Sequence, residues 1–203
     1  MRPVLHGRLG TLMAAVAAFE VGNVAATLLI LRATELLTPG RSTQTATTLA
    51  LLLYTLYNAA ATAASLPAGR LADRLGPHGP ARVLTAGVAL FAAAYTGFAV
   101  TDANLALLTL PFAAAGLAIG CVETAEHAAV AALAPANLRG SAFGLLATIQ
   151  AAGNLAASAV AGIIWTSISP TAAFYYLTGW MLLAVAALTI ADRSSNSRTD
   201  VHG

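Results

Sequence analysis

Hydrophobic residues form long uninterrupted segments along this chain, separated by short polar stretches. The segments without any charged side chain are residues 42–69, 83–101, 103–122 and 140–191. Residues 9–31 are equally apolar except for one acid, Glu20. The segment 140–191 is too long for one helix across a bilayer, because the hydrocarbon core needs about 20 residues. The stretch "TSISPT" at residues 166–171 predicts a turn within it, since proline ends helices.

This pattern predicts an all-α membrane protein with six transmembrane helices in a single domain, residues 1–203. The expected spans lie near residues 10–32, 46–66, 82–101, 104–130, 141–166 and 171–191. A polar cytoplasmic tail, residues 192–203, is expected after the last span. Helices are favoured over a β-barrel because the segments are long and continuous, whereas barrel strands alternate over about 10 residues.

The composition agrees with a chain that lies in a lipid bilayer. Hydrophobic residues make up 58% of the chain and charged residues only 9%, against about 25% charged residues in soluble domains. The basic residues are all arginines at or near apolar segments, and no patch combines them with aromatic residues. We therefore expect no nucleic-acid partner. Cys121 is the single cysteine, which excludes an intramolecular disulfide.

The arginines predict the orientation of the chain. Eight lie on the side of both predicted termini: Arg2, Arg8, Arg70, Arg74, Arg82, Arg139, Arg193 and Arg198. Arg32 and Arg41 lie on the other side. Because cytoplasmic loops carry an excess of basic residues, both termini are expected in the cytoplasm of a bacterial-type inner membrane. The first apolar segment is longer than the roughly 7–15 residues of a cleavable signal, so we expect it to be a permanent span.

Three motifs resemble the major facilitator superfamily. "GRLADRLG" at residues 69–76 is similar to its signature loop, G-x-L-A-D-R-x-G followed by basic residues. "PANLRGSAFG" at residues 135–144 is similar to its P-x-x-x-R-G-x-A-x-G loop, and "FEVGNVAATLLILRA" at residues 19–33 to its seventh span. The order of the motifs matches the C-terminal six spans of a twelve-span transporter. The resemblance implies six helices arranged as 3+3 repeats, with the third and sixth outermost.

The resemblance also implies a latch in the charged loop. An acid such as Asp73 would face the positive N-terminal end of a helix in the opposite half, while arginines pair with acids on neighbouring spans. The residues of this predicted latch are Gly69, Arg70, Asp73, Arg74, Gly76, Arg82, Glu123, Glu126, His127, Arg139 and Gly140. The alternative is a solvated loop whose arginines only fix the topology. For Glu123, Glu126 and His127 the alternatives are a solvated helix end or a metal site, and an ion-pair role is favoured over both.

Polar residues inside the predicted spans are candidates for transport, because such side chains are costly in a bilayer. Asn23 follows Glu20 at i+3, on the same helical face. Similar stripes follow the second span, with Tyr54, Asn58 and Thr62, and the fifth span, with Gln150, Asn154 and Ser158. The candidate residues are Glu20, Asn23, Asn58, Gln150 and Asn154. The third and sixth spans carry no charged, amide or imidazole side chain.

Glu20 is the leading candidate because it lies at the midpoint of the first predicted span. Removal from water favours the neutral form of a carboxyl group, and a group that gains and loses a proton as its site is wetted can couple transport to protons. The alternatives are a neutral acid bonded to a neighbouring helix and a lipid-facing residue without function.

The predicted function is secondary active transport of a small organic substrate, with proton-coupled export, as the C-terminal half of a permease. No cofactor and no metal are expected. The expected partners are lipid, the small-molecule substrate, and either an N-terminal six-helix half or a second copy. The alternative is a truncated or split half-transporter that acts only in membrane assembly. An enzyme is disfavoured, because none of the four histidines lies in the sixth span and no G-x-S-x-G motif is present.

Overall fold

The computed structural model describes residues 7–199, and the side chains within residues 9–190. Helices make up almost all of this part, and no strand occurs in it. The helices are α1 Gly7–Glu20, α2 Ala26–Leu37, α3 Thr43–Arg74, α4 Gly79–Val100, α5 Leu105–Leu133, α6 Arg139–Ser167 and α7 Pro170–Thr199. Short 3-10 turns, η2 Gly76–His78 and η3 Ala136–Leu138, precede α4 and α6.

Five segments of the described residues are long and apolar enough to cross a membrane. They are Thr43–Arg74, Gly76–Val100, Leu105–Leu133, Ala136–Ser167 and Pro170–Ile190. The all-helical membrane class predicted from the sequence is therefore confirmed, while the sixth span and the 3+3 repeat stay predictions. Residues 192–199 of the predicted polar tail continue α7; their side chains and residues 200–203 lie outside the described part.

The first apolar segment differs from the prediction of one continuous helix over residues 10–32. α1 ends at Glu20 and α2 begins at Ala26, so residues 21–25 interrupt the span. Gly22 and Asn23 both favour such a break, since glycine adds backbone freedom and asparagine competes for backbone hydrogen bonds. Only the shorter apolar helix Leu9–Glu20 remains on the N-terminal side of the break.

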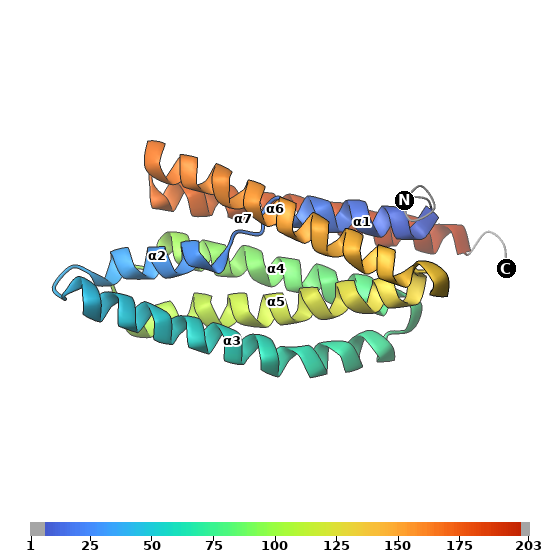
Figure 1. Cartoon of the computed structure of the whole chain (residues 1–203), viewed down its shortest axis with the longest axis horizontal. Helices are drawn as coiled ribbons and strands as arrows, with labels where there is room; N and C mark the ends of the chain where they lie inside the picture. The colour runs from blue at the N-terminus through green and yellow to red at the C-terminus, as the bar shows by residue number, and fades with distance from the viewer. Residues whose placement is uncertain (1–6, 200–203) are drawn as a thin grey trace.

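The helix ends place the charged loops together. In Figure 1 the start of α1, the end of α7, the α3–α4 turn and the α5–α6 turn all lie at one end of the bundle. The α2–α3, α4–α5 and α6–α7 connections lie at the opposite end. Arg70 and Arg74, which the sequence analysis placed in a loop, lie in the last turns of α3. They therefore share an end of the bundle with Arg139, the first residue of α6, as the orientation argument requires.

Arg32, one of the two arginines counted at the opposite end, is not a loop residue. It lies within α2 and is buried. Its Nε donates a hydrogen bond to the Phe98 carbonyl oxygen at 3.2 Å, and its Nη2 donates to Thr171 Oγ1 at 3.3 Å. Arg32 thus joins α2 to the end of α4 and the start of α7. Arg41 is therefore the exposed arginine at that end. The difference between the two ends in exposed basic residues is thus larger than the arginine count alone predicted.

The bundle is centred on α4. α3 packs along α5, α5 along α4, and α4 along α7, while α6 contacts α1 and α7 (Figure 1). Aromatic side chains fill the centre: Phe98 meets Phe112 edge-on at 5.0 Å between ring centroids, and Tyr95 lies 6.1 Å from Phe174. The resemblance implied that the third span lies outermost. Within this chain α4 is the most buried of the long helices, and α3 and α6 are the least buried. The outermost position in a two-half assembly stays a prediction.

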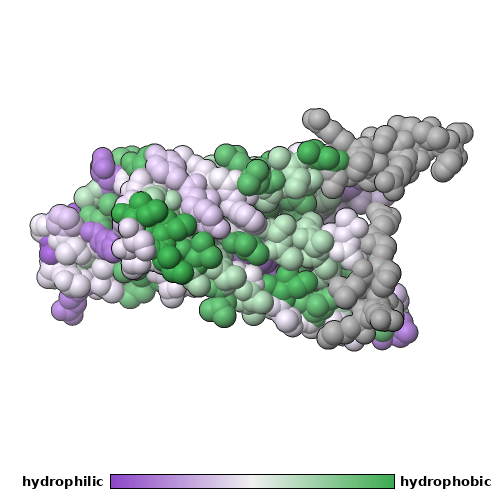
Figure 2. All heavy atoms as spheres, turned by 90° about the horizontal axis from the view of Figure 1, so that it is seen from above, coloured by the Kyte–Doolittle hydropathy of each residue, from purple (hydrophilic) through white to green (hydrophobic). Residues whose placement is uncertain are grey.

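Large apolar side chains cover much of the molecular surface. Leu52 on α3 is 61% exposed and Leu155 on α6 is 73% exposed. Figure 2 shows hydrophobic side chains over the middle of one face and hydrophilic ones gathered at the end opposite the start of α1. A surface of this kind is unfavourable in water and fits contact with lipid or with another protein.

Candidate functional site

The break between α1 and α2 is held by side chains of two other helices. The Val24 backbone N–H donates to the Tyr95 hydroxyl on α4 at 3.3 Å. The Ala25 N–H donates to Ser158 Oγ on α6 at 2.9 Å. Because no water is available in a bilayer core, non-helical backbone is tolerated there only where such partners are built in. The interruption is therefore a specified feature of the fold.

A second pair of contacts fixes the break itself and the last turn of α1. Asn154 Nδ2 on α6 donates to the Asn23 carbonyl oxygen at 2.9 Å. Trp180 Nε1 on α7 donates to the Ala18 carbonyl oxygen at 2.6 Å. The indole ring of Trp180 also occupies the space beside Gly22, where an added Cβ would collide with Cδ1. A side chain at position 22 would therefore force the indole away.

Glu20 is the last residue of α1 and is buried at the break, with 3% of its surface exposed. Its Oε2 accepts a hydrogen bond from Asn23 Nδ2 at 3.0 Å. On the other side, Gly153 of α6 lies against it. A Cβ on Gly153 would collide with Glu20 Cβ and would lie 3.0 Å from its backbone carbonyl carbon. The carboxyl group is thus enclosed by the end of its own helix and by α6.

Glu126 lies in the interior, which differs from the predicted ion pairing with the loop arginines. Its side chain has no exposed surface, and its Oε2 accepts a hydrogen bond from Gln150 Nε2 on α6 at 2.8 Å. Its Oε1 has no hydrogen-bond partner among the described residues. Gln150, which bonds to Glu126, and Gly153, which lies against Glu20, are three residues apart on α6. The buried acids therefore lie on two different helices that face α6.

The two predicted polar stripes have different outcomes. All three members of the α6 stripe, Gln150, Asn154 and Ser158, donate or accept a hydrogen bond across helices, as described above. On α3, Tyr54 is half-buried while Asn58 and Thr62 are exposed, and Asn58 Nδ2 donates to the Tyr54 carbonyl oxygen of its own helix at 2.8 Å. The structure thus brings Glu20, Asn23, Gln150 and Asn154 together and leaves Asn58 apart.

The predicted latch residues lie at the end of the bundle near the start of α1. Arg70, Asp73, Arg74, Arg82, Arg139 and Gly140 are all exposed. Gly76 follows the end of α3 with a φ of 67°, a left-handed conformation that favours glycine and ends helices. Within the described part of the chain, Asp73 takes part in no ion pair.

The remaining candidates, Glu123 and His127, lie on the exposed face of α5. His127 Nδ1 is 2.7 Å from the Glu123 carbonyl oxygen, and its ring stacks on Phe143 with the centroids 5.7 Å apart. A Cβ added at Gly69 would be in ordinary van der Waals contact with Thr124, 3.5 Å from its Cγ2. Among the residues that the structure describes, no three histidine, cysteine, aspartate or glutamate side chains are grouped to hold a metal ion.

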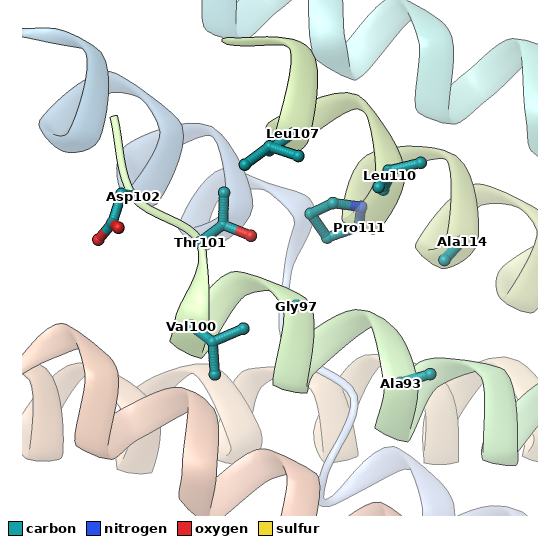
Figure 3. A pocket seen from close by; sticks show the side chains of 9 residues that line it. All are labelled: Ala93, Gly97, Val100, Thr101, Asp102, Leu107, Leu110, Pro111 and Ala114. Atoms are coloured by element: carbon teal, nitrogen blue, oxygen red, sulfur yellow. The ribbon is translucent and has the colours of Figure 1, made fainter. Parts of the chain in front are cut away.

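A groove on the surface lies away from these residues, between the end of α4 and the start of α5 (Figure 3). Its lining is mainly apolar, with Leu107, Leu110 and Pro111 on one side, and Asp102 is the charged residue at its margin. None of the predicted site residues lines it. It is a surface feature separate from the buried acids.

Three residues of the site were not predicted from the sequence: Tyr95, Gly153 and Trp180. The third and sixth spans were set aside because they carry no charged or amide side chain, yet they supply the hydroxyl of Tyr95 and the indole of Trp180. A buried hydroxyl or indole N–H inside an apolar segment needs a hydrogen-bond partner. This requirement could have identified Tyr95 and Trp180 as site residues from the sequence.

These features define a polytopic helical membrane protein with a break between α1 and α2 and two buried acids. The chain belongs to the Major Facilitator Superfamily, whose profile matches residues 9–202. The resemblance inferred from the three motifs is thus confirmed. An uncharacterized MFS-type transporter of Methanocaldococcus jannaschii is 32% identical over 174 residues, which are 86% of this chain and 42% of that protein. The chain therefore spans less than half the length of this curated relative.

Proposed function

We propose that this chain is the C-terminal half of a secondary active transporter that exports small organic molecules in exchange for protons. The observation that carries the proposal is the break at residues 21–25, with the buried carboxyl group of Glu20 at its edge. Discontinuous helices near the bilayer midplane are typical of substrate and coupling-ion sites in transporters. Membership of a superfamily of transporters favours this function over catalysis.

Glu20 suits the coupling of transport to protons. Burial disfavours its charged form, while the amide of Asn23, 3.0 Å away, stabilises that form. These opposing influences leave the carboxyl group responsive to wetting, because water entering from one side adds solvation that the closed state lacks. A proton bound on one side can therefore be released on the other as the site alternates.

The proposal includes a second half. α3 and α6 are the least buried of the long helices, and Asn58 and Thr62 on α3 are exposed within an otherwise apolar segment. In a two-half transporter, the substrate site lies between the halves, and a second half would cover such a surface. We propose that the partner is a separate N-terminal six-helix half or a second copy, in an inner membrane with both termini cytoplasmic.

Reconstitution tests this function directly. The purified chain is placed in lipid vesicles alone and together with a six-span N-terminal half, and a pH gradient is imposed. Uptake of a set of radiolabelled small organic molecules is then compared with empty vesicles. Gradient-driven uptake by either preparation is the expected result. No uptake in any combination would overturn transport and favour the alternative, a half-transporter that acts only in membrane assembly.

Asp73 provides a test of the latch. Asp73→Asn is expected to shift the balance of inward-open and outward-open states by about two- to fivefold, because a charge at a helix end contributes about 0.3–1 kcal/mol. The measurement is labelling of cysteines introduced at exposed positions near the two ends, Ala131 and Thr48, in a Cys121→Ala background within the assembled transporter. Asp102→Asn, which changes an exposed acid at the other end, is the control. Unchanged labelling at both positions would count against the latch.

A further inference from the structure

Glu126 has an unsatisfied carboxyl oxygen in the interior of the bundle. The side chain is completely buried, Gln150 Nε2 donates to Oε2 at 2.8 Å, and Oε1 has no partner among the described residues. A buried polar atom without a partner is costly and unusual in native structures. The hydrogen bond at Oε2 uses that atom as an acceptor. Oε1 is therefore the atom left to carry a proton.

Glu20 and Glu126 meet the same part of α6. Gln150 bonds to Glu126, and Gly153, three residues later, lies against Glu20. Three residues of an α-helix span about 4.5 Å along its axis. The next residue, Asn154, holds the backbone of Asn23, whose side chain bonds to Glu20. One turn of α6 thus positions both acids.

The surroundings of the pair contain acids and amides. Glu123, three residues before Glu126 on the same helix, is exposed. Asn23 donates one hydrogen bond to Glu20, and Gln150 donates one to Glu126. No ion pair joins Glu20 or Glu126 to a basic side chain in the described part of the chain, and His127 is directed to Phe143. The pair therefore has no basic partner there to balance two negative charges.

We propose that Glu20 and Glu126 form one two-carboxyl site that holds a single exchangeable proton, which enters at Glu126 Oε1. This inference rests on the proposed proton coupling and adds a second proton-binding residue to it. Two carboxyl groups that interact in a low-dielectric interior do not both ionise readily, so one proton is retained by the pair. Their titration is then a property of the pair and not of either residue.

The order of the two acids gives the site a direction. Glu126 lies seven residues before Leu133, the last residue of α5, or about 10 Å along the helix axis. Glu20 lies thirteen residues after Gly7, the first residue of α1, or about 20 Å. Both distances start from the end that carries the arginine loops (Figure 1). A proton that leaves a hydronium ion at that end therefore binds Glu126 Oε1 first, because Glu20 lies deeper in the bundle.

Infrared spectroscopy of the protonated carboxyl C=O band tests this site without requiring transport. The full chain is reconstituted in lipid, and the band is followed across a pH titration in the wild type, Glu20→Gln, Glu126→Gln and, as the matched control on α5, Glu123→Gln. We expect Glu20→Gln and Glu126→Gln each to lose part of the protonated carboxyl C=O band. The remaining buried acid should then ionise about 1 pH unit or more lower than in the pair, because the neighbouring like charge is gone. Glu123→Gln should leave most of the band and its titration in place.

Gln150→Met provides a second test in case Glu20→Gln or Glu126→Gln fails to fold. It removes the hydrogen bond to Glu126 Oε2 while keeping both acids, so the protonated band should persist to higher pH. Independent titration of the two acids, with neither variant altering the other group, would overturn the two-carboxyl site and leave the transport proposal standing. Conversely, coupled titration without uptake in vesicles would overturn the transport proposal and leave the site standing.

Discussion

Glu20→Gln is expected to abolish pH-driven flux while the protein still inserts and folds. Glutamine keeps the size of the side chain and can still accept the hydrogen bond that Asn23 Nδ2 donates to Oε2. It cannot release a proton, so the pH gradient no longer drives the conformational cycle. The measurement is uptake in vesicles of the assembled transporter with and without a pH gradient. Flux with the gradient should fall to that seen without it, and exchange driven by the substrate gradient should remain.

The control for this prediction is Glu123→Gln, which changes an exposed acid of α5. It should retain most of the gradient-driven flux, because water already solvates that group. Size-exclusion chromatography and circular dichroism show whether each variant is folded. Wild-type pH-driven flux in Glu20→Gln would refute the coupling role and favour the view that Glu20 only bonds neighbouring helices together.

Gly153→Leu is expected to destabilise the protein and displace the broken span. Position 153 faces the backbone of Glu20 so closely that even a Cβ would lie 3.0 Å from its carbonyl carbon. Overpacking of a well-packed interior typically costs about 1–3 kcal/mol, and here α1 and α6 must separate to relieve it. The hydrogen bond from Asn154 to the Asn23 carbonyl oxygen would then lengthen or break. We expect lower stability to SDS titration and loss of transport together.

Gly162→Leu is the matched control on the same helix. A Cβ on Gly162 would meet nothing within 4 Å, and both variants gain the same intrinsic helix propensity. The difference between them therefore reports the contact with Glu20 alone. If Gly153→Leu were as stable and active as Gly162→Leu, the close packing of α6 on the end of α1 would be wrong.

The sequence predicted the membrane class and the family because both depend on local features. Long uncharged segments require helices that satisfy their own backbone in lipid, whatever their neighbours. The loop "GRLADRLG" likewise carries its meaning in consecutive residues, and the glycine that ends α3, Gly76, adopts the left-handed conformation that a helix end favours. The i, i+4 spacing of Gln150 and Asn154 correctly placed these polar side chains on one helical face.

The sequence near the break between α1 and α2 contains only part of what specifies it. Gly22 and Asn23 permit an interruption, but its stability depends on the Tyr95 hydroxyl and on Ser158, which are 71 and 133 residues away in the chain from the groups that they bind. Asn58 is the opposite case, in which the spacing predicted a contact between helices that the described structure does not contain. Its spacing with Tyr54 and Thr62 matched that of the α6 stripe, yet its amide bonds only to its own helix.

By itself, therefore, the sequence determined that the chain is an all-helical membrane protein and which superfamily it belongs to. Only the tertiary structure decided which polar groups meet. It buried Arg32 between α2, α4 and α7, and it directed Glu126 to Gln150 instead of to the loop arginines. The physical reason is that hydropathy and spacing fix the depth and face of a side chain on its own helix. The rotation of each helix against its neighbours follows from the packing of all of them together.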